Sequence, residues 1–237
     1  MTSAENPATI AIPTSMTDPK PKLRWFQYSL RTLLVLVILC AFACSWLAVK
    51  LQQAKQQQEA AAEIVKLGGE IQYDWQRDPE GHNLPDAKMP TPKWLRSLLG
   101  NDLFQSVSFV RFEGTKVTDS ELEHLKGLRH LQQLLLENTQ VTDAGLEQLQ
   151  GLSQLKWLNL EGTQVTESGL EHLKGLSNLQ ELQLDKKVTD AGMENLKGLS
   201  QLKKLCLVGT KLTEGDVKKL HQALPNCKIY QLRALER

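Results

Sequence analysis

The chain has 237 residues, with 28 Lys and Arg against 27 Asp and Glu and a net charge of +1. This balance argues against nucleic acid or a strongly acidic molecule as a partner of the whole chain. The four cysteines, Cys40, Cys44, Cys206 and Cys227, form no Cys-x-x-Cys pair and are too scattered for a disulfide framework or a zinc site. Aromatic residues make up 5%, whereas leucine recurs throughout the C-terminal half, which indicates many small, similar packing units.

The first residues predict a disordered tail. Four prolines lie among Ser, Thr and Asp, with almost no apolar periodicity. Such a segment cannot bury enough surface to offset its chain entropy. We therefore expect residues 1–24 to form a disordered cytoplasmic tail.

Residues 25–50 are predicted to be a transmembrane helix with an interfacial flank. Eighteen consecutive uncharged residues, 32–49, are bracketed by Arg31 and Lys50. A helix of this length spans roughly 27 Å, close to the ~30 Å hydrocarbon core, and should contact the lipid bilayer along 32–49. Aromatic residues suited to the membrane interface flank it: Trp25, Phe26, Tyr28 and Trp46.

Two further points concern this segment. Ala41-Phe42-Ala43 before Cys44 has the form of a signal-peptide cleavage site, but the apolar run continues past it, which favours an uncleaved signal anchor. Residues 20–31 hold four basic side chains and residues 50–61 hold two. The positive-inside rule then predicts a cytoplasmic N-terminus and an extracytoplasmic C-terminal domain at the cell membrane.

Residues 51–69 are predicted to form a stalk helix that ends at Gly68-Gly69. Apolar and small residues recur at alternating steps of four and three, a seam that could pair as a short coiled coil. The seam consists of Leu47, Leu51, Ala54, Gln58, Ala61 and Val65. Ala and Gln are weak choices there, so a solvated helix or one packed on the domain edge is the other interpretation.

A motif of Val or Leu, then Thr, then an acid recurs in the C-terminal half. Its five copies begin, at spacings of 24, 24, 23 and 24 residues, at Val117, Val141, Val165, Val188 and Leu212. Each follows a Leu-x-x-Leu-x-Leu segment, which the first unit replaces by Val107, Val110 and Phe112. Self-similarity at such a period indicates repeats that stack because no single unit can bury its apolar face alone.

The repeat unit predicts a strand, a turn and a short helix. Leu-x-Leu places both leucines on one face of the strand. A Thr follows three residues later and can bond the turning backbone: Thr115, Thr139, Thr163 and Thr210. The next Thr is expected to be a helix N-cap, and Thr118 with Glu121 has the capping-box pattern. The fourth unit is one residue shorter at Asp185-Lys186-Lys187 and lacks the turn Thr, so its turn should lose a ladder bond.

These motifs resemble the leucine-rich-repeat family, with Leu-x-x-Leu-x-Leu-x-x-Thr where the family usually has Asn or Cys last. The Thr-Asp-Ala-Gly-Leu segment is similar to the cysteine-containing subclass. The resemblance covers about residues 107–231 and implies an α/β solenoid with parallel strands on the concave face and helices on the convex face. We expect this domain at 107–237, with five repeats and an end strand. Ser29–Leu34, a stalk and such repeats also resemble bacterial membrane-anchored leucine-rich-repeat proteins, which implies no function.

Residues 70–106 are expected to cap the N-terminal end of the solenoid. Residues 70–75 alternate like a strand, and 76–90 are polar and rich in Pro and Gly, hence a loop. Residues 91–100 have Pro at the first helical position and Gly at the end. The apolar residues of this helix are expected to cover the first repeat: Trp94, Leu95, Leu98 and Leu99.

The sequence contains no constellation typical of an enzyme. His124 and His172 occupy the same position two repeats apart, so repetition explains them. There is no Gly-rich phosphate loop, nucleophile elbow or His-Glu-x-x-His stretch. We expect no catalytic residues, no cofactor and no metal.

The strand residues that alternate with the core leucines form the candidate site, three columns across the concave face. The candidate protein-binding residues are Phe109, Gln133, Trp157 and Glu181 in the first column, Arg111, Leu135, Asn159 and Gln183 in the second, and Glu113, Glu137, Glu161 and Asp185 in the third. An ordinary solvated sheet is the alternative interpretation. The acidic third column predicts a basic partner.

The leading hypothesis is a non-catalytic, membrane-anchored module that binds another protein, with no role for nucleic acid. The alternative is an envelope scaffold that self-associates as a weak homodimer through the stalk or the transmembrane helix. Cys206 and Cys227 are predicted to be free thiols, Cys206 on the concave face and Cys227 facing inward. Repeat alignment makes Gln231 the neighbour of Cys206, four residues from Cys227 and too far for a disulfide.

Overall fold

The computed structural model of the protein describes residues 30–78, 81–187, 189–210 and 213–232. The chain divides into two compact units, Met1–Ser45 and Trp46–Arg237. The predicted tail at 1–24, and the aromatic flank at 25–28, lie outside the described residues.

The described part of the first unit is helical. Helix α1 (Leu30–Lys66) begins there and continues without interruption into the second unit. It is long and apolar enough to cross a membrane, a criterion that a signal sequence near the N-terminus also meets. The side chains of Thr32–Ser45 are exposed. The apolar segment of the helix has the length and composition predicted for residues 32–49.

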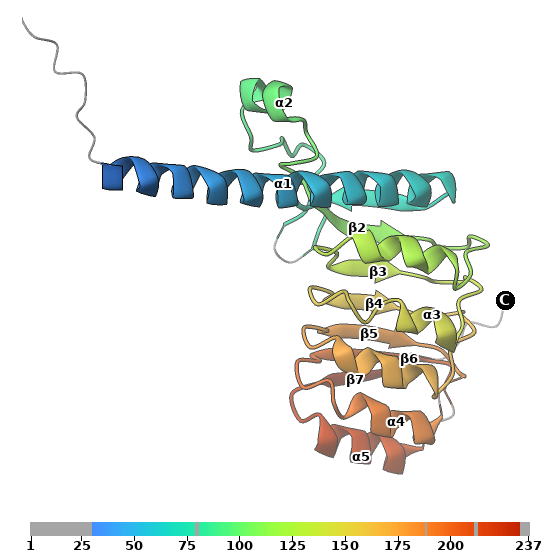
Figure 1. Ribbon diagram of the computed structural model, residues 1–237. Coiled ribbons are helices and arrows are strands. Elements are labelled where there is room, and N and C mark those ends of the chain that lie inside the picture. Colours follow the sequence, from blue (N-terminus) through green and yellow to red (C-terminus); the bar gives the residue numbers. More distant parts are fainter. Residues whose placement is uncertain (1–29, 79–80, 188, 211–212, 233–237) are drawn as a thin grey trace, which may run out of the picture. The chain divides into compact units, whose positions relative to one another are not determined.

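The second unit contains one sheet in which seven strands follow chain order (Figure 1). The strands are β1 (Glu70–Tyr73), β2 (Val107–Arg111), β3 (Gln133–Leu135), β4 (Trp157–Asn159), β5 (Glu181–Leu184), β6 (Lys204–Val208) and β7 (Lys228–Leu232). Strands β2 to β7 pair in parallel, as the repeats predict, and β1 adds to the sheet antiparallel to β2.

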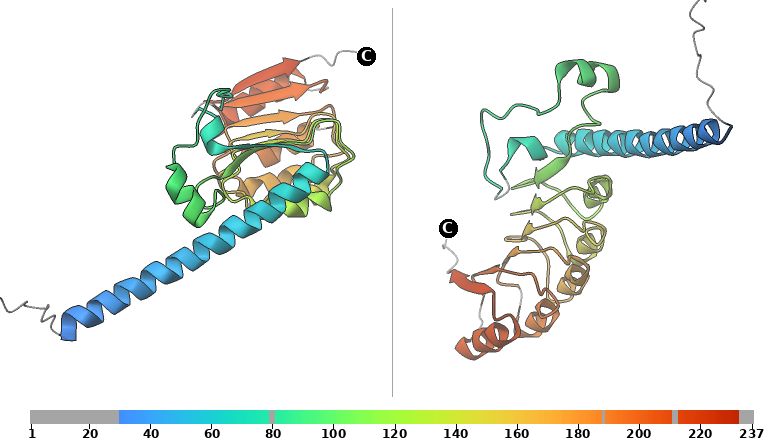
Figure 2. Two further views of the ribbon diagram at one scale, coloured as in Figure 1. Left: turned by 90° about the horizontal axis from the view of Figure 1, so that it is seen from above. Right: turned by 90° about the vertical axis from the view of Figure 1, so that its left-hand side faces the viewer.

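Short helical segments connect successive strands and lie along the opposite side of the stack (Figure 2). They are η2 (Glu121–Gly127), α3 (Asp143–Glu147), η3 (Gly169–Gly175), α4 (Asp190–Leu196) and α5 (Glu214–Ala223). Two of them are 3₁₀ helices, and the other three are α-helices. The leucines of strands and helices share one continuous core between the two layers.

Three of the four turn threonines act as predicted. Thr115, Thr139 and Thr163 each donate their hydroxyl to the carbonyl three residues earlier, at 2.7, 2.8 and 2.7 Å. The hydroxyl of Thr210 is buried and has no partner among the described residues, next to an undescribed pair of positions. These bonds take the place of the ladder hydrogen bonds that the backbone loses where it turns away from the sheet.

The shortened fourth turn loses ladder bonds, as predicted. In the two preceding turns, Gln140 and Gln164 donate their backbone N–H to the Val117 and Val141 carbonyls at 3.0 and 2.8 Å. Within the described residues no such bond reaches the carbonyl of Val165. Instead, the ammonium of Lys187 donates to the Thr163 carbonyl at 2.8 Å and partly compensates for the loss. Val188 lies outside the described residues.

The C-terminal half of α1, within the second unit, packs on the first repeat. Ala60, Ala61 and Ile64 are buried in the common core. The buried amide of Gln57 donates to the Gln105 carbonyl at 3.0 Å and accepts from the Val107 N–H at 3.2 Å. Of the two interpretations of the stalk, packing on the domain edge is therefore the one that the structure shows.

Helix α2 (Lys93–Leu99) forms where predicted, but its expected role as the cap was wrong. Trp94 and Leu98 are 67% and 72% exposed, so they do not cover the first repeat. Trp94 and Leu98 do not cover the first repeat because α1 and β1 already occupy that end of the core. A pattern within residues 91–100 cannot reveal this competition.

The C-terminal end of the sheet corrects the predicted register. Cys206 pairs with Tyr230, three residues after Cys227, and not with Gln231. The offset from β6 to β7 is 24 residues, as it is from β2 to β3, β3 to β4 and β4 to β5, whereas the predicted pair implied 25. The predicted register was therefore wrong by one position. As predicted, Cys227 is buried and Cys206 is only half-buried, and burial raises the pKa of the Cys227 thiol to about 11.

Candidate functional site

The strand register brings the first two predicted columns together on one face. Gln133, Trp157 and Glu181 are direct partners across β3, β4 and β5. Leu135, Asn159 and Gln183 are partners in the second column. Phe109 and Arg111 extend the two columns onto β2. The third column follows directly after the strands, at Glu113, Glu137, Glu161 and Asp185.

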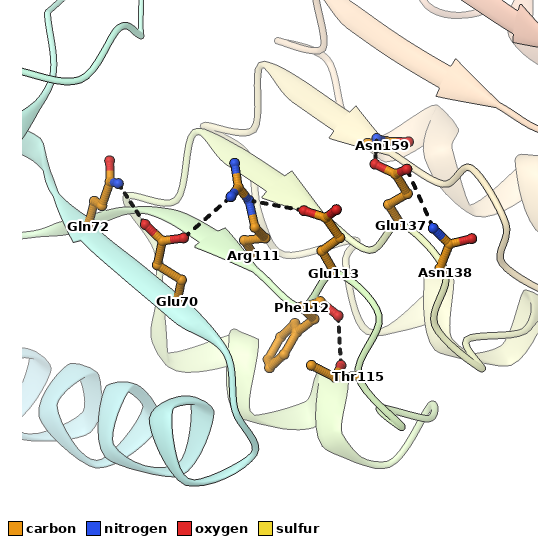
Figure 3. Close-up of polar contacts among 9 residues, drawn as sticks. All are labelled: Glu70, Gln72, Arg111, Phe112, Glu113, Thr115, Glu137, Asn138 and Asn159. Atoms are coloured by element: carbon orange, nitrogen blue, oxygen red, sulfur yellow. Dashed lines mark hydrogen bonds and ion pairs between the residues drawn. The ribbon is translucent and has the colours of Figure 1, made fainter.

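The acids of the third column are held by polar groups of the second column. Arg111 approaches Glu113 at 3.8 Å, and Asn159 donates to Glu137 at 3.3 Å (Figure 3). The Gln183 amide donates to Glu161 in the same manner. In the two amide cases, a side chain of one repeat donates to the acid of the repeat before it. These hydrogen bonds orient the carboxylates and offset part of their mutual repulsion.

Glu137, the second acid of the column, has a raised pKa. Partial burial, with smaller contributions from the charges of Glu161 and Glu113, raises the pKa of Glu137. Like charges at neighbouring positions disfavour ionisation, and desolvation acts in the same direction. The column therefore presents a negative field that a cation would stabilise.

The loop after β1 covers the first-column residue of β2. The guanidinium of Arg77 lies 4.3 Å from the centroid of the Phe109 ring, and that of Arg111 lies at 5.6 Å. Phe109 is only 2% exposed as a result. The loop position Gly81 touches Gln133 so closely that a Cβ there would lie 2.0 Å from the side-chain nitrogen of Gln133. Phe109, predicted as a contact residue, is thus buried inside the domain and does not belong to its surface.

Two second-column residues are also buried. Leu135 is 8% exposed and Asn159 is 5% exposed. Asn159 accepts the Glu161 backbone N–H at 2.9 Å while it donates to Glu137, so its amide serves the turn. Neither residue offers much area to a partner, and Asn159 supports the acidic column through its bond to Glu137.

The open surface is smaller than predicted because Phe109, Leu135 and Asn159 are buried. Arg111, Glu113 and Gln133 remain accessible at one end, and the other six residues lie on β4 and β5 and in the turns after β3, β4 and β5. Trp157, Gln183 and Glu161 are half-exposed, as are Glu137, Glu181 and Asp185. Glu181 is paired with Lys204 at 3.4 Å. We call this set the acidic patch: Glu137, Trp157, Glu161, Glu181, Gln183 and Asp185.

Sequence reasoning missed the contribution of the cap region to the concave face. Glu70 on β1 approaches Arg111 at 3.5 Å, so Arg111 lies between Glu70 and Glu113 (Figure 3). Arg77, in the segment predicted as an ordinary loop, contacts Phe109. The alternation of residues 70–75 indicated an added strand, but no local pattern indicates which way the following loop folds.

The described residues contain no group of three or more His, Cys, Asp or Glu arranged to hold a metal ion. His124 and His172 lie on η2 and η3, the equivalent convex segments that the repeat predicts. The open concave surface carries carboxylates, amides and one indole, groups that suit binding.

The stacked strand–turn–helix units, their leucine core and their parallel concave sheet define a leucine-rich-repeat solenoid. Comparison with family models and with curated protein sequences gives no match. Among solved structures, the chain is similar to a leucine-rich-repeat protein of Leptospira interrogans (21% identity, TM-score 0.37, 45% of this chain and 27% of that one). It is also similar to an internalin of Listeria monocytogenes (21% identity, TM-score 0.33, 48% of this chain and 38% of that one). A third similar structure is the leucine-rich-repeat ectodomain of an Arabidopsis thaliana receptor kinase (15% identity, TM-score 0.41, 76% of this chain and 92% of that one).

The matched region spans 27% and 38% of the length of the first two structures. The overall superpositions are poor, and the assignment of the fold rests on this chain's own repeats and sheet.

Proposed function

We propose that this protein is a membrane-anchored, non-catalytic module that binds a basic region of another protein on its acidic patch. The observation that carries the proposal is the arrangement around Trp157. A half-exposed indole lies on the same concave face as a column of carboxylates, with the amides that orient those carboxylates between them. Aromatic anchors beside oriented charges are typical of binding hot spots.

The membrane anchor is the second part of the proposal. The apolar segment of α1 supports a single crossing by its length and composition. The excess of basic residues before it favours a cytoplasmic N-terminus, which would place the repeats outside the cell membrane. Protease added to intact spheroplasts should then remove a C-terminal tag. A tag that survives until the cells are lysed would reverse the orientation.

The binding surface can be tested by photo-crosslinking in intact cells. A photoreactive residue in place of Glu161 should capture a partner with a basic surface, and capture should fall steeply as salt is raised. Trp157→Ala and Glu137→Lys should each abolish that capture, because they remove the anchor and reverse the charge. Glu147→Lys is the matched control, since it reverses an exposed charge on the convex side. If the Trp157 and Glu137 variants capture the same partner as the control does, the site lies elsewhere.

The alternative function, self-association through the stalk, is restricted by packing. Ala61, a member of the predicted pairing seam, is buried against the first repeat. A homodimer through this helix would therefore have to use its exposed members, such as Leu51 and Gln58, or the apolar segment before them. Crosslinking that returns only copies of this chain would favour this alternative.

A further inference from the structure

Helix α2 presents an apolar face that nothing in the described chain covers. Trp94 and Leu98 lie one helical turn apart and are 67% and 72% exposed. Residues four apart share one side of a helix, so the two side chains form a single protrusion. Burial of two such side chains away from water would normally stabilise the fold substantially, which makes their exposure notable.

The chain attaches α2 close to the residue that borders the predicted membrane span. Asp102 and Leu103, three and four residues after the end of α2, line a cavity together with Lys50. The Gln57 amide binds the carbonyl of Gln105 in the same segment at 3.0 Å. Helix α2 (Figure 1) is therefore tethered to the part of the second unit where α1 enters it.

The segment that carries the apolar face is basic, and so is most of the charge that lines the cavity beside Lys50. Residues 87–100 contain Lys88, Lys93 and Arg96 and no acid. The cavity beside Lys50 adds Arg129 and His130, with Asp102 as its one acidic lining residue. This charge complements an anionic lipid surface and disfavours a second, equally cationic copy of the same face.

We propose that α2 inserts Trp94 and Leu98 into the interfacial layer of the bilayer that α1 spans, with Lys88 and Lys93 against anionic headgroups. Tryptophan and leucine on one side of a helix, with basic residues beside them, are the composition of interfacial anchors. A helix as short as α2 binds a membrane weakly by itself. The α1 anchor supplies the missing affinity, because it holds α2 at a high effective concentration near the lipid. This inference rests on the membrane anchoring proposed above.

The test uses the full chain in vesicles of phosphatidylcholine and phosphatidylglycerol with acyl-chain bromine, which quenches tryptophan that contacts lipid. Variants remove one tryptophan at a time. Trp94→Phe should remove a fluorescence component that brominated lipid quenches and that aqueous acrylamide does not. Trp157→Phe, on the concave sheet, is the control and should remove a component with the opposite behaviour. Leu98→Asn and Lys93→Glu, both at exposed positions, should return Trp94 to acrylamide.

The outcomes separate this inference from the anchoring on which it rests. If Trp46→Phe and Trp94→Phe both remove only components that brominated lipid leaves unquenched, the anchoring itself fails. If Trp46 contacts lipid and Trp94 is quenched by acrylamide, only the insertion of α2 is wrong. Protection of Trp94 from both quenchers would mean that a protein surface covers it, which also overturns the proposal.

Discussion

The first repeat differs from the second and third repeats in how it satisfies the equivalent threonine. In the second repeat, Asp119 accepts the backbone N–H and hydroxyl of Thr142 at 2.7 and 2.6 Å. Asp143 accepts the same two groups of Thr166, again at 2.7 and 2.6 Å. Each carboxylate thus belongs to the repeat before the threonine that it binds.

The first repeat has no equivalent predecessor, and it supplies the acid itself. Glu121 accepts the N–H and hydroxyl of Thr118 at 2.7 and 2.6 Å. The internal repeats have glycine at the position of Glu121, namely Gly145 and Gly169. The glycine leaves room for the neighbour's carboxylate, since a Cβ at Gly145 would lie 2.4 Å from Asp119 Oδ1. In the second and third repeats the threonine and the glycine three residues later therefore form a contact between repeats, and the first repeat replaces this contact with a local cap.

The largest effect should come from filling the space of that contact. Gly145→Ala would place its Cβ 2.4 Å from Asp119, 2.9 Å from Val141 and 3.0 Å from Leu122. We expect a loss of roughly 2–3 kcal/mol in the free energy of unfolding, the range of overpacked cores. Urea unfolding of the full chain in detergent measures it. Gly151→Ala is the matched control, because nothing lies within 4 Å of its added Cβ; equal losses in both would contradict the inter-repeat contact.

A smaller loss should follow removal of the carboxylate. Asp119→Ala leaves the Thr142 N–H and hydroxyl without their acceptor and should cost about 1–2 kcal/mol. The same unfolding measurement applies. Glu167, which replaces this Asp in the third repeat, has a side chain with no hydrogen bond or ion pair to the described residues, so Glu167→Ala should change stability little. Equal costs for the two variants would show that the acids act only through the charge of the first helical turn.

The smallest effect should appear in the pH dependence of the first repeat. Hydrogen bonds from the Thr118 side chain, and then from its backbone, lower the pKa of Glu121 below its ordinary value of 4.5. The lowered pKa gives stability that is present above the unfolded pKa and is lost as the pH falls through the folded pKa. The stability difference between wild type and Glu121→Gln should therefore shrink as the pH falls from 7 towards 3. A constant difference, or one that Glu147→Gln reproduces, would mean that the bonds do not depend on the ionised form.

The sequence predicted the repeats, the parallel sheet and the columns because these depend on local periodicity. The turns at Thr115, Thr139 and Thr163 and the lost ladder bond of the fourth repeat were confirmed for the same reason, whereas no bond is seen for Thr210 among the described residues. The direction of the Asp119 contact was not predicted. An acid directly after a threonine suits the first turn of its own helix equally well, and only the stacking of repeats decides which threonine it binds.

The candidate site was harder to predict than the fold. Alternation identified which residues point to the concave face, but Phe109 is covered by Arg77 from a loop with no periodic signal. The cap was assigned to Trp94 and Leu98 on composition, whereas Ile64 and Gln57 of the long helix occupy that end. Both errors concern packing between segments that are distant in sequence, which hydrophobic periodicity does not encode.

The Gln57 amide also fixes how α1 can move. One side chain donates to the Gln105 carbonyl and accepts from the Val107 N–H, so it takes the place of a neighbouring peptide group at the sheet. After the C-terminal end of the helix, a Cβ at Gly69 would lie 2.7 Å from both Ile64 and Phe112, so this end is closely fitted. Sliding α1 by one turn, about 5.4 Å, would break both hydrogen bonds of the Gln57 amide and would also withdraw Ile64 from the core. The helix can therefore pack on the first repeat in only one position. A force along the helix axis is either resisted by this contact or breaks both hydrogen bonds and the packing of Ile64 together.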